Sequence, residues 1–473
     1  MNKKIIKSVL FLLILSVLML RLNDIFKLKQ EDGIYPVKIF YEQEKDSIDV
    51  IFYGSSHAYS NINPAVLWKE EGIASFDLAG SLQPLWNTYY YMKESLKYQR
   101  PKVMVVELVR AIEEREYIEE ARTITNTFGM KLSREKYEAI QVSTPDHLVD
   151  YLLGFPVYHS RYAELSREDF EPYLGDPNGN VYKGFYPLFA TKEYETFSDM
   201  SQVTDSRALS PKTEEYLRKI IALSEQEEIP LVFMVAPYQG IVESEQQIFN
   251  RAKEIAAEED VPFLDFNLCY EELGLDPKED LAEFSHLNHR GSTKLSAWLA
   301  QYLKEEYQLP DRRGDALYIS WDQNAAVWDQ MYQNQILKEE AGWYDFLELI
   351  SKNPDYTYLI SLDGTFDNGE QPLYETLTSI GMSEEIAAQG GIWIHGPDVE
   401  ETFSGQEEVN YHLELKKCDW IVRKGLSGVE LIVDGENYFK TVNGLNILVY
   451  DNKTESFVTA VGFDAENSYN YIG

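Results

Sequence analysis

The stretch that decides the fold is SIDVIFYGSSHAYSNINP, residues Ser47–Pro64. Its apolar part, Ile48–Tyr53, is short and almost continuous, which is typical of a strand buried on both faces of a parallel sheet. The run ends in Gly54-Ser-Ser-His57 and then breaks into polar and turn residues. Open α/β folds bind ligands at the carboxyl ends of their strands, so these hydroxyl groups are expected at such an edge. For this motif alone, the favoured interpretation is a Ser-rich loop that only caps a helix beginning near Pro64.

A second stretch, EFSHLNHRG over Glu283–Gly291, lies far downstream and immediately precedes a predicted amphipathic helix. The apolar residues of that helix recur at i, i+3 and i+4. Glu283 stands three residues before His286. A serine hydroxyl becomes a good nucleophile when a histidine takes its proton, and the imidazole needs an acceptor on its other nitrogen. The spacing therefore suits a base and the carboxylate that orients it.

Together the two stretches resemble the SGNH, or GDSL-type, hydrolase superfamily. In that superfamily the nucleophile sits in an early Gly-Asp-Ser block, and the acid and base sit in a late Asp-x-x-His block. The resemblance implies that Ser56 is the nucleophile, His286 the base and Glu283 the acid. It also implies that Gly80, the glycine of the second block, and Ser56 lend backbone amides to an oxyanion hole. The order serine, acid, histidine along the chain agrees with the superfamily.

The sequence departs from that pattern at three places. Ser55 stands where the first block usually has Asp, and Glu283 replaces the usual acidic Asp. The third block, Gly-x-Asn-Asp, is absent, because residues 105–110 read VVELVR. Loss of one oxyanion-hole donor can cost about a hundredfold or more in rate. The departures support a second hypothesis, a catalytically weak or inactive glycan- or protein-binding surface protein that uses the hydrolase fold as a scaffold.

Residues 46–308 alternate between predicted strands and helices, which implies a three-layer α/β domain with a parallel sheet. The predicted strands are 48–53, 74–78, 102–108, 230–236 and 263–266, and the predicted helices are 64–71, 81–98, 211–226 and 243–258. Residues 110–200 interrupt this alternation as a helical, aromatic insertion, and such insertions often shape a substrate cleft. His159 and Arg161 are candidates to line it, with a packed His159 as the favoured interpretation.

The N-terminus resembles a targeting segment. Lys3, Lys4 and Lys7 precede an apolar run, Val9–Leu20, and neither a small-x-small cleavage site nor a lipobox cysteine follows. An uncleaved signal anchor over residues 1–29 is therefore favoured, and a cleaved, secreted form is the alternative. The positive flank predicts a cytoplasmic N-terminus with the rest of the chain outside the cell membrane.

The pattern changes at Leu309–Asp315, a charged boundary followed by a helical connector up to residue 339. Beyond it, a smaller α+β, strand-rich module is predicted, with strands at 356–362, 391–395, 409–415, 429–433 and 445–449. Asp434-Gly435 and Asn443-Gly444 fit tight hairpin turns. The module thus spans residues 340–473.

Short motifs in this module resemble the interleukin-like EMT inducer, or PANDER-like, domain over residues 340–466. They are Tyr358–Asp363, Leu377–Gly381, Gly391–Ile394, Asn443–Asp451 and Gly462–Asp464. The resemblance implies binding of a glycan or a protein. Core packing is the favoured interpretation of Trp393 and Phe463.

Composition excludes several classes of function. A formal charge of −36 over 473 residues argues against nucleic acid as a partner, because phosphate binding needs a cationic surface. The two cysteines suggest neither a disulfide framework nor a metal site, and no cofactor or metal is predicted.

The predicted function is that of a membrane-anchored, extracytoplasmic carbohydrate esterase or O-acyltransferase. Its expected partners are a cell-surface polysaccharide or other acylated glycan, the membrane through the N-terminal helix and, for a transferase, a membrane-embedded acyl-donor protein.

Overall fold

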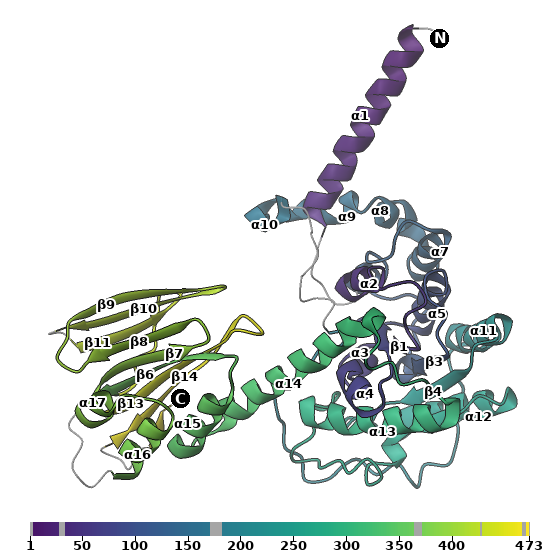
Figure 1. The fold of residues 1–473 in the computed structure, drawn as a ribbon. Helices are drawn as coiled ribbons and strands as arrows, with labels where there is room; N and C mark the ends of the chain where they lie inside the picture. Colours follow the sequence, from purple (N-terminus) through teal and green to yellow (C-terminus); the bar gives the residue numbers. More distant parts are fainter. Residues whose placement is uncertain are drawn as a thin grey trace. The chain divides into compact units, whose positions relative to one another are not determined.

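The structure is a computed structural model that describes residues 3–27, 34–170, 182–363, 371–425, 428–465 and 470–472. The chain divides into two compact units, Met1–Ala325 and Ala326–Gly473 (Figure 1). The first unit is built around a parallel sheet and the second around antiparallel sheets.

The first unit contains a five-stranded sheet in the order β2-β1-β3-β4-β5. Every neighbouring pair is parallel. The strands are β1 (Val50–Gly54), β2 (Ser75–Ala79), β3 (Val103–Glu107), β4 (Leu231–Val235) and β5 (Phe263–Asp265). The first four are buried along their whole length. The predicted α/β class with a parallel sheet is confirmed.

Two separate cores lie against the two faces of this sheet, because alternate residues of a strand point to opposite sides. In β1, Ile51 and Tyr53 join one core and Val50 and Phe52 join the other. The first core is completed by α5 (Leu85–Ser95), α11 (Pro211–Glu227) and α12 (Glu243–Glu258). The second is completed by α4 (Pro64–Glu71) and α13 (His289–Tyr307).

The helix predicted over 81–98 is shorter than expected. Helix α5 begins at Leu85, after Pro84 at its N-cap. The residue before a proline is disfavoured in helical conformation, which explains the late start. Leu82, inside the predicted range, lies outside the helix with a φ of +47°.

Before the sheet, the chain forms α1 (Lys3–Phe26) and α2 (Ile34–Phe40). The segment Lys4–Phe26 is long and apolar enough to cross a membrane, with a mean hydropathy of 2.4. Helices also form in the predicted insertion, namely α6 (Glu120–Thr125), α7 (Arg134–Ser143), α8 (Leu148–Leu153), α9 (Phe155–Tyr158) and α10 (Arg167–Phe170).

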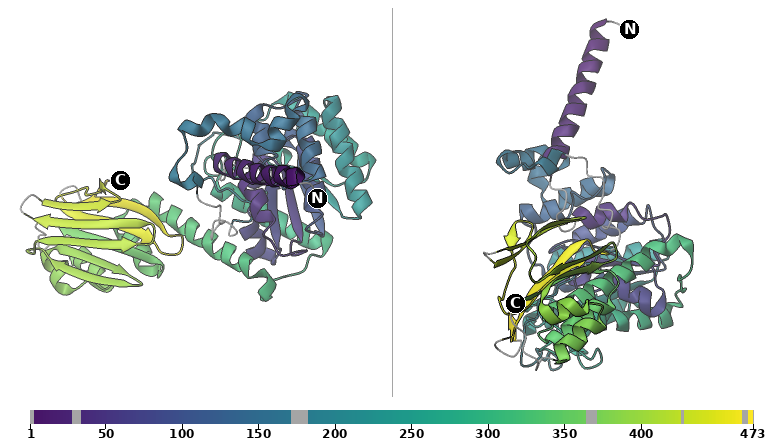
Figure 2. Two further views of the ribbon diagram at one scale, coloured as in Figure 1. Left: turned by 90° about the horizontal axis from the view of Figure 1, so that it is seen from above. Right: turned by 60° about the vertical axis from the view of Figure 1, so that its left-hand side comes forward.

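The second unit contains a six-stranded sheet, ordered β15-β14-β13-β6-β7-β8, and a four-stranded sheet, ordered β12-β11-β10-β9 (Figure 2). The strands of the first are β6 (Tyr356–Asp363), β7 (Gly391–Gly396), β8 (Val399–Ser404), β13 (Gly444–Asp451), β14 (Ser456–Asp464) and β15 (Asn470–Ile472). Those of the second are β9 (Val409–Leu415), β10 (Cys418–Gly425), β11 (Gly428–Val433) and β12 (Glu436–Asn437). The neighbouring strands in both sheets pair antiparallel.

Among the described residues, three helices belong to the same unit as the six-stranded sheet. They are α15 (Trp343–Lys352), α16 (Gln371–Ser379) and α17 (Glu384–Gln389), and α14 (Ile319–Glu339) contains the boundary between the two units. The second unit is thus built mainly of antiparallel strands, and α14 lies within the segment predicted as a helical connector. Trp393 and Phe463 are buried, in agreement with the interpretation that they belong to the core.

One of the two predicted hairpin turns is wrong. Asp434 and Gly435 both have positive φ and join β11 to β12, so that Val433 pairs with Glu436. Gly444, however, is the first residue of β13 and pairs with β6 and β14, not with the preceding strand. A side chain there would lie 2.0 Å from the carbonyl oxygen of Phe463. The close approach of the neighbouring strand, and not a turn, therefore explains why residue 444 is a glycine.

Candidate active site

Ser56 is the first residue of α3 (Ser56–Tyr59), directly after the carboxyl end of β1. The turn depends on Gly54, whose φ is +146° and where a Cβ atom would lie 2.9 Å from that of Glu107. Any larger residue would strain the backbone and meet β3. Ser55 is buried and Ser56 is partly exposed, so the second serine is the one that solvent can reach.

The structure brings Ser56, His286 and Glu283 into one chain of hydrogen bonds. Ser56 Oγ lies 2.8 Å from His286 Nε2, and His286 Nδ1 is hydrogen-bonded to the Glu283 carboxylate. The carboxylate also accepts a 2.9 Å bond from the amide of Ser285. With the carboxylate on Nδ1, the proton of a neutral imidazole resides on that nitrogen, and Nε2 is left as an acceptor for the serine hydroxyl.

An asparagine joins the two loops that carry these groups. The side-chain oxygen of Asn61 accepts a 3.0 Å bond from the amide of Leu287, next to His286. On the other side, the amide of Asn63 donates to Ser296 Oγ of α13 at 2.7 Å. Sequence reasoning missed Asn61, because a single asparagine in a turn carries no signal of a partner more than two hundred residues away.

The end of the insertion runs beside both loops. The amide of Tyr186 donates to the carbonyl of Tyr59 at 2.7 Å, and the amide of His289 donates to the carbonyl of Leu188 at 2.7 Å. This segment begins at Lys183, a fully buried residue whose ammonium donates to Gln43 and Ser320. The insertion thus borders the site, as expected of it, although through residues that the sequence did not single out.

His159 and Arg161 take other positions. His159 is exposed, so the prediction that it packs in a core is wrong. Arg161 donates to the carbonyl of Phe26 and to Asp169. Both lie in the short helical turn His159–Ala163 that follows α9.

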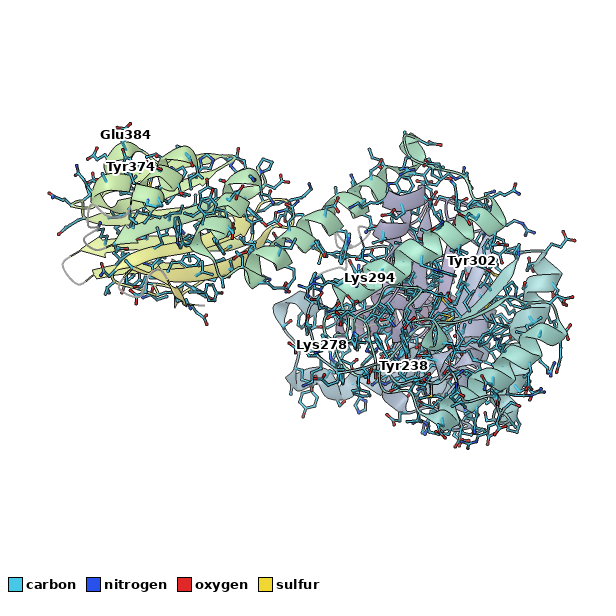
Figure 3. All side chains as sticks on the ribbon, turned by 90° about the horizontal axis from the view of Figure 1, so that it is seen from below. Tyr238, Lys278, Lys294, Tyr302, Tyr374 and Glu384 are labelled. Carbon is cyan, nitrogen blue, oxygen red and sulfur yellow. The ribbon has the colours of Figure 1, made fainter. Side chains whose placement is uncertain are left out.

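His57 packs against His286. Its ring centroid lies 4.9 Å from that of His286 and 5.1 Å from that of Tyr238, which is labelled in Figure 3. Its Nδ1 is buried and has no hydrogen-bond partner among the described residues. Burial, the neighbouring His286 and the charge of Arg110 all hold the pKa of His57 well below its usual value. A neutral ring therefore backs His286.

Glu107 occupies the end of β3, where the third block would have its asparagine. Its carboxylate accepts bonds from the amides of Val109 (2.9 Å) and Ala236 (3.5 Å). Burial raises the pKa of Glu107 to about 8, against the lowering effect of these amides, of Arg110 and of Ser55. Glu107 is thus a largely protonated group that joins β3 to the end of β4.

Gly80 lies just past the end of β2, but its amide is engaged. The Gly80 N–H donates to the carbonyl of Gly54 at 3.3 Å, so it is not directed at an open oxyanion position. A Cβ atom at Gly80 would lie 2.2 Å from Asn126 Oδ1. By contrast, Ser56 is the first residue of a helix, and its amide has no acceptor within that helix.

The described part of the chain contains no group of three or more His, Cys, Asp or Glu residues able to hold a metal ion. No protein-family model and no curated protein matches the chain. A search of solved structures matches a "putative acylhydrolase" from Bacteroides fragilis at 10% identity and a TM-score of 0.29. The match covers 56% of this chain and 91% of the other. Similarity at this level establishes neither a shared fold nor a shared activity.

Proposed function

We propose that the chain is a membrane-anchored, extracytoplasmic carbohydrate esterase or O-acyltransferase of SGNH type. The observation that carries the proposal is the alignment of Ser56 Oγ, the His286 ring and the Glu283 carboxylate. Such an alignment is the minimum that makes a serine hydroxyl nucleophilic.

In the proposed reaction, Ser56 Oγ attacks the acyl carbonyl while His286 Nε2 takes the hydroxyl proton. The tetrahedral intermediate then collapses, the bond to the sugar oxygen breaks, and His286 returns the proton to that oxygen. An acyl ester on Ser56 remains. Water or a second sugar hydroxyl attacks this ester with His286 again as base, which releases the acyl group and restores the serine. Glu283 holds the Nδ1 proton and stabilises the imidazolium in each half-reaction.

The oxyanion requires hydrogen-bond donors aimed at the developing charge. The Ser56 amide is proposed as one donor, because the helix gives it no acceptor. Gly80 can serve as the second only if its long 3.3 Å bond to the carbonyl of Gly54 opens when substrate binds. Hydrogen bonds in substrate-free sites often become aligned only in the complex.

The proposal of a cell-surface glycan as substrate rests on two supports. One is an N-terminal apolar helix preceded by lysines, which places the remainder outside the cytoplasm if it acts as an anchor. The other is the strand-rich second unit, proposed here as a PANDER-like module that binds a glycan or protein. Both supports are analogies between a whole segment of this chain and a class of segment in other proteins.

One observation favours the alternative function, a weak or inactive binding protein on the same scaffold. The end of β3 carries a buried Glu107, engaged by the amides of Val109 and Ala236, in place of the asparagine, and the amide of Gly80 is already bonded. A site with one oxyanion donor would be expected to react about a hundredfold more slowly than a complete one.

The discriminating experiment measures acetate release by the full-length protein in detergent micelles, from an aryl acetate and from acetylated polysaccharides. Ser56→Ala should lower kcat/KM by about a thousandfold or more. Ser201→Ala, at an exposed serine outside the site, should match the wild type. Equal rates for Ser56→Ala and wild type would leave only the binding function. Adding glycan acceptors then separates transfer from hydrolysis.

A further inference from the structure

Large apolar side chains are exposed along the helices of the insertion, α8 to α10. Val149 is 64% exposed, Leu153 55%, Tyr162 74% and Phe170 62%. Val149 and Leu153 are four residues apart on α8 and therefore share one face of it. Exposed apolar residues that gather in this way on a soluble domain often mark a contact with another protein or a membrane.

This part of the insertion is attached to the end of α1. Gly154 packs so closely on Asn23 that a Cβ atom would lie 2.5 Å from the Asn23 side-chain oxygen. The Arg161 guanidinium donates to the carbonyl of Phe26, the last residue of α1. In both Figure 1 and Figure 2, α8, α9 and α10 lie at the C-terminal end of α1 and run across its axis.

The attachment occurs at a defined depth along the apolar helix. At 1.5 Å per residue, the part of the candidate span from Lys4 to Leu22, whose charged residues Lys4, Lys7 and Arg21 lie toward its two ends, is about 28 Å long, close to the thickness of a bilayer's hydrocarbon core. The polar residues that follow, from Asn23 on, would then lie at the level of the lipid headgroups. Helices fixed to Asn23 and Phe26 lie at the same level.

Charge cannot supply the attraction to a membrane here. The chain carries a formal charge of −36, and between Leu148 and Phe170 the acidic residues Asp150, Glu164, Glu168 and Asp169 outnumber the arginines, Arg161 and Arg167. Arg161 is engaged by Phe26 and Asp169. Contact with lipid would therefore depend on burial of apolar side chains, and tyrosine is a residue that favours the membrane interface.

We propose that α8 to α10 form a second membrane contact, in which Val149, Leu153, Tyr162 and Phe170 enter the headgroup region of the leaflet where α1 emerges. The partner is the lipid bilayer itself. The inference rests on the proposed anchoring by α1 and goes beyond it, because it assigns a lipid-facing surface to the folded domain. A span combined with an interfacial surface would keep the Ser56 loop within reach of substrates near the membrane.

The test uses the full-length protein in phosphatidylcholine vesicles, with Cys269 and Cys418 replaced by serine and one fluorescent label at a time on an introduced cysteine. Leu153→Cys reports the proposed surface, and Val149→Cys repeats the measurement on the same face. Leu12→Cys reports the span. Gln301→Cys, exposed on α13, is the control, since Figure 1 shows α13 at the end of the unit away from α1. Quenching is measured with lipids that carry a nitroxide at the headgroup or in the middle of the acyl chain.

We expect headgroup nitroxide to quench the labels at 153 and 149 at least about threefold more than the label at 301, with no loss in high salt. The label at 12 should respond most to the mid-chain nitroxide. If the label at 12 responds while those at 153 and 149 match the control, the interfacial contact is refuted and the anchor stands. If the label at 12 does not respond, α1 does not span the bilayer and the proposal fails with it.

Discussion

His286 is the residue on which the proposed chemistry depends most. It is held between Ser56 and Glu283 by hydrogen bonds and is backed by the rings of His57 and, beyond it, Tyr238. A neutral His57 adds no positive charge beside the imidazolium that forms during the reaction. The proposed role of Glu283 is to fix the tautomer of His286, and this can be tested without removing the packing of Glu283.

Glu283→Gln should lower kcat by about a hundredfold to ten-thousandfold with little change in KM, because a neutral amide neither stabilises the imidazolium nor fixes the tautomer. Glu283→Asp keeps the charge and should lose less. Steady-state hydrolysis of an aryl acetate measures both. An unaltered kcat for the glutamine variant would show that this carboxylate has no part in the reaction.

Glu107 should make stability fall as pH rises. Its pKa is raised to about 8 in the folded chain, above its ordinary value of 4.5, so the folded state binds the proton more tightly. The protonated Glu107 therefore contributes its whole share of the folding stability below about pH 4.5, and this contribution is lost as the pH rises through about 8. Glu107→Gln, which is neutral at every pH, should show a flatter dependence of Tm between pH 5 and 9.

At each pH, the free energy of unfolding of the variant is subtracted from that of the wild type. This subtraction removes the contributions of other groups such as Lys183. The difference should change by an amount on the order of a few kcal/mol across this range. A constant difference would mean that Glu107 is ionised in the folded protein.

Among the elements, two loops at the carboxyl edge of the sheet must keep their relative positions, namely the loop that carries Ser56 and the loop that carries His286. The bond from the Leu287 amide to Asn61 links them. Asn61→Ala leaves that buried amide without an acceptor, which should cost about 1–3 kcal/mol of stability and reduce kcat more than it alters KM. Asn61→Asp retains an acceptor and should recover most of the rate. Chemical denaturation and steady-state kinetics on the three proteins check this, and equal kcat values would contradict it.

The elements also show how far sequence reasoning reaches. The parallel sheet was predictable, because β1 to β4 are short, mainly apolar runs separated by segments with helical periodicity. The pairing of Ser56 with His286 could be predicted from a resemblance, because the stretches around these two residues are similar to two sequence blocks of a known superfamily. Asn61 and Lys183 could not be found, because their partners are set by tertiary packing. Gly444 was misread as a turn residue because a glycine needed for close strand approach and one needed for a turn look alike in sequence.

At the scale of the whole molecule, the chain contains two units with separate cores. We expect a defect in the second core to leave the chemistry of the first intact. Phe463→Ala, at a fully buried position, should destabilise the second unit by about 3–5 kcal/mol.

Calorimetry should then resolve an earlier transition, while the hydrolysis rate below that temperature stays at the wild-type value. Phe233→Ala, at an equally buried position in the first unit, is the matched control and should lower the transition that coincides with loss of activity. Parallel loss of activity in both variants would contradict the independence of the two cores.

The central claim is that Ser56 is activated by His286, and covalent labelling tests it most directly. The full-length protein is treated with a fluorophosphonate, which reacts with activated serines, and the adduct is located by peptide mass spectrometry. The account predicts a single adduct on Ser56, absent in Ser56→Ala and formed at least about a hundredfold more slowly in His286→Ala. An adduct elsewhere, no adduct, or an equal rate in His286→Ala would contradict it.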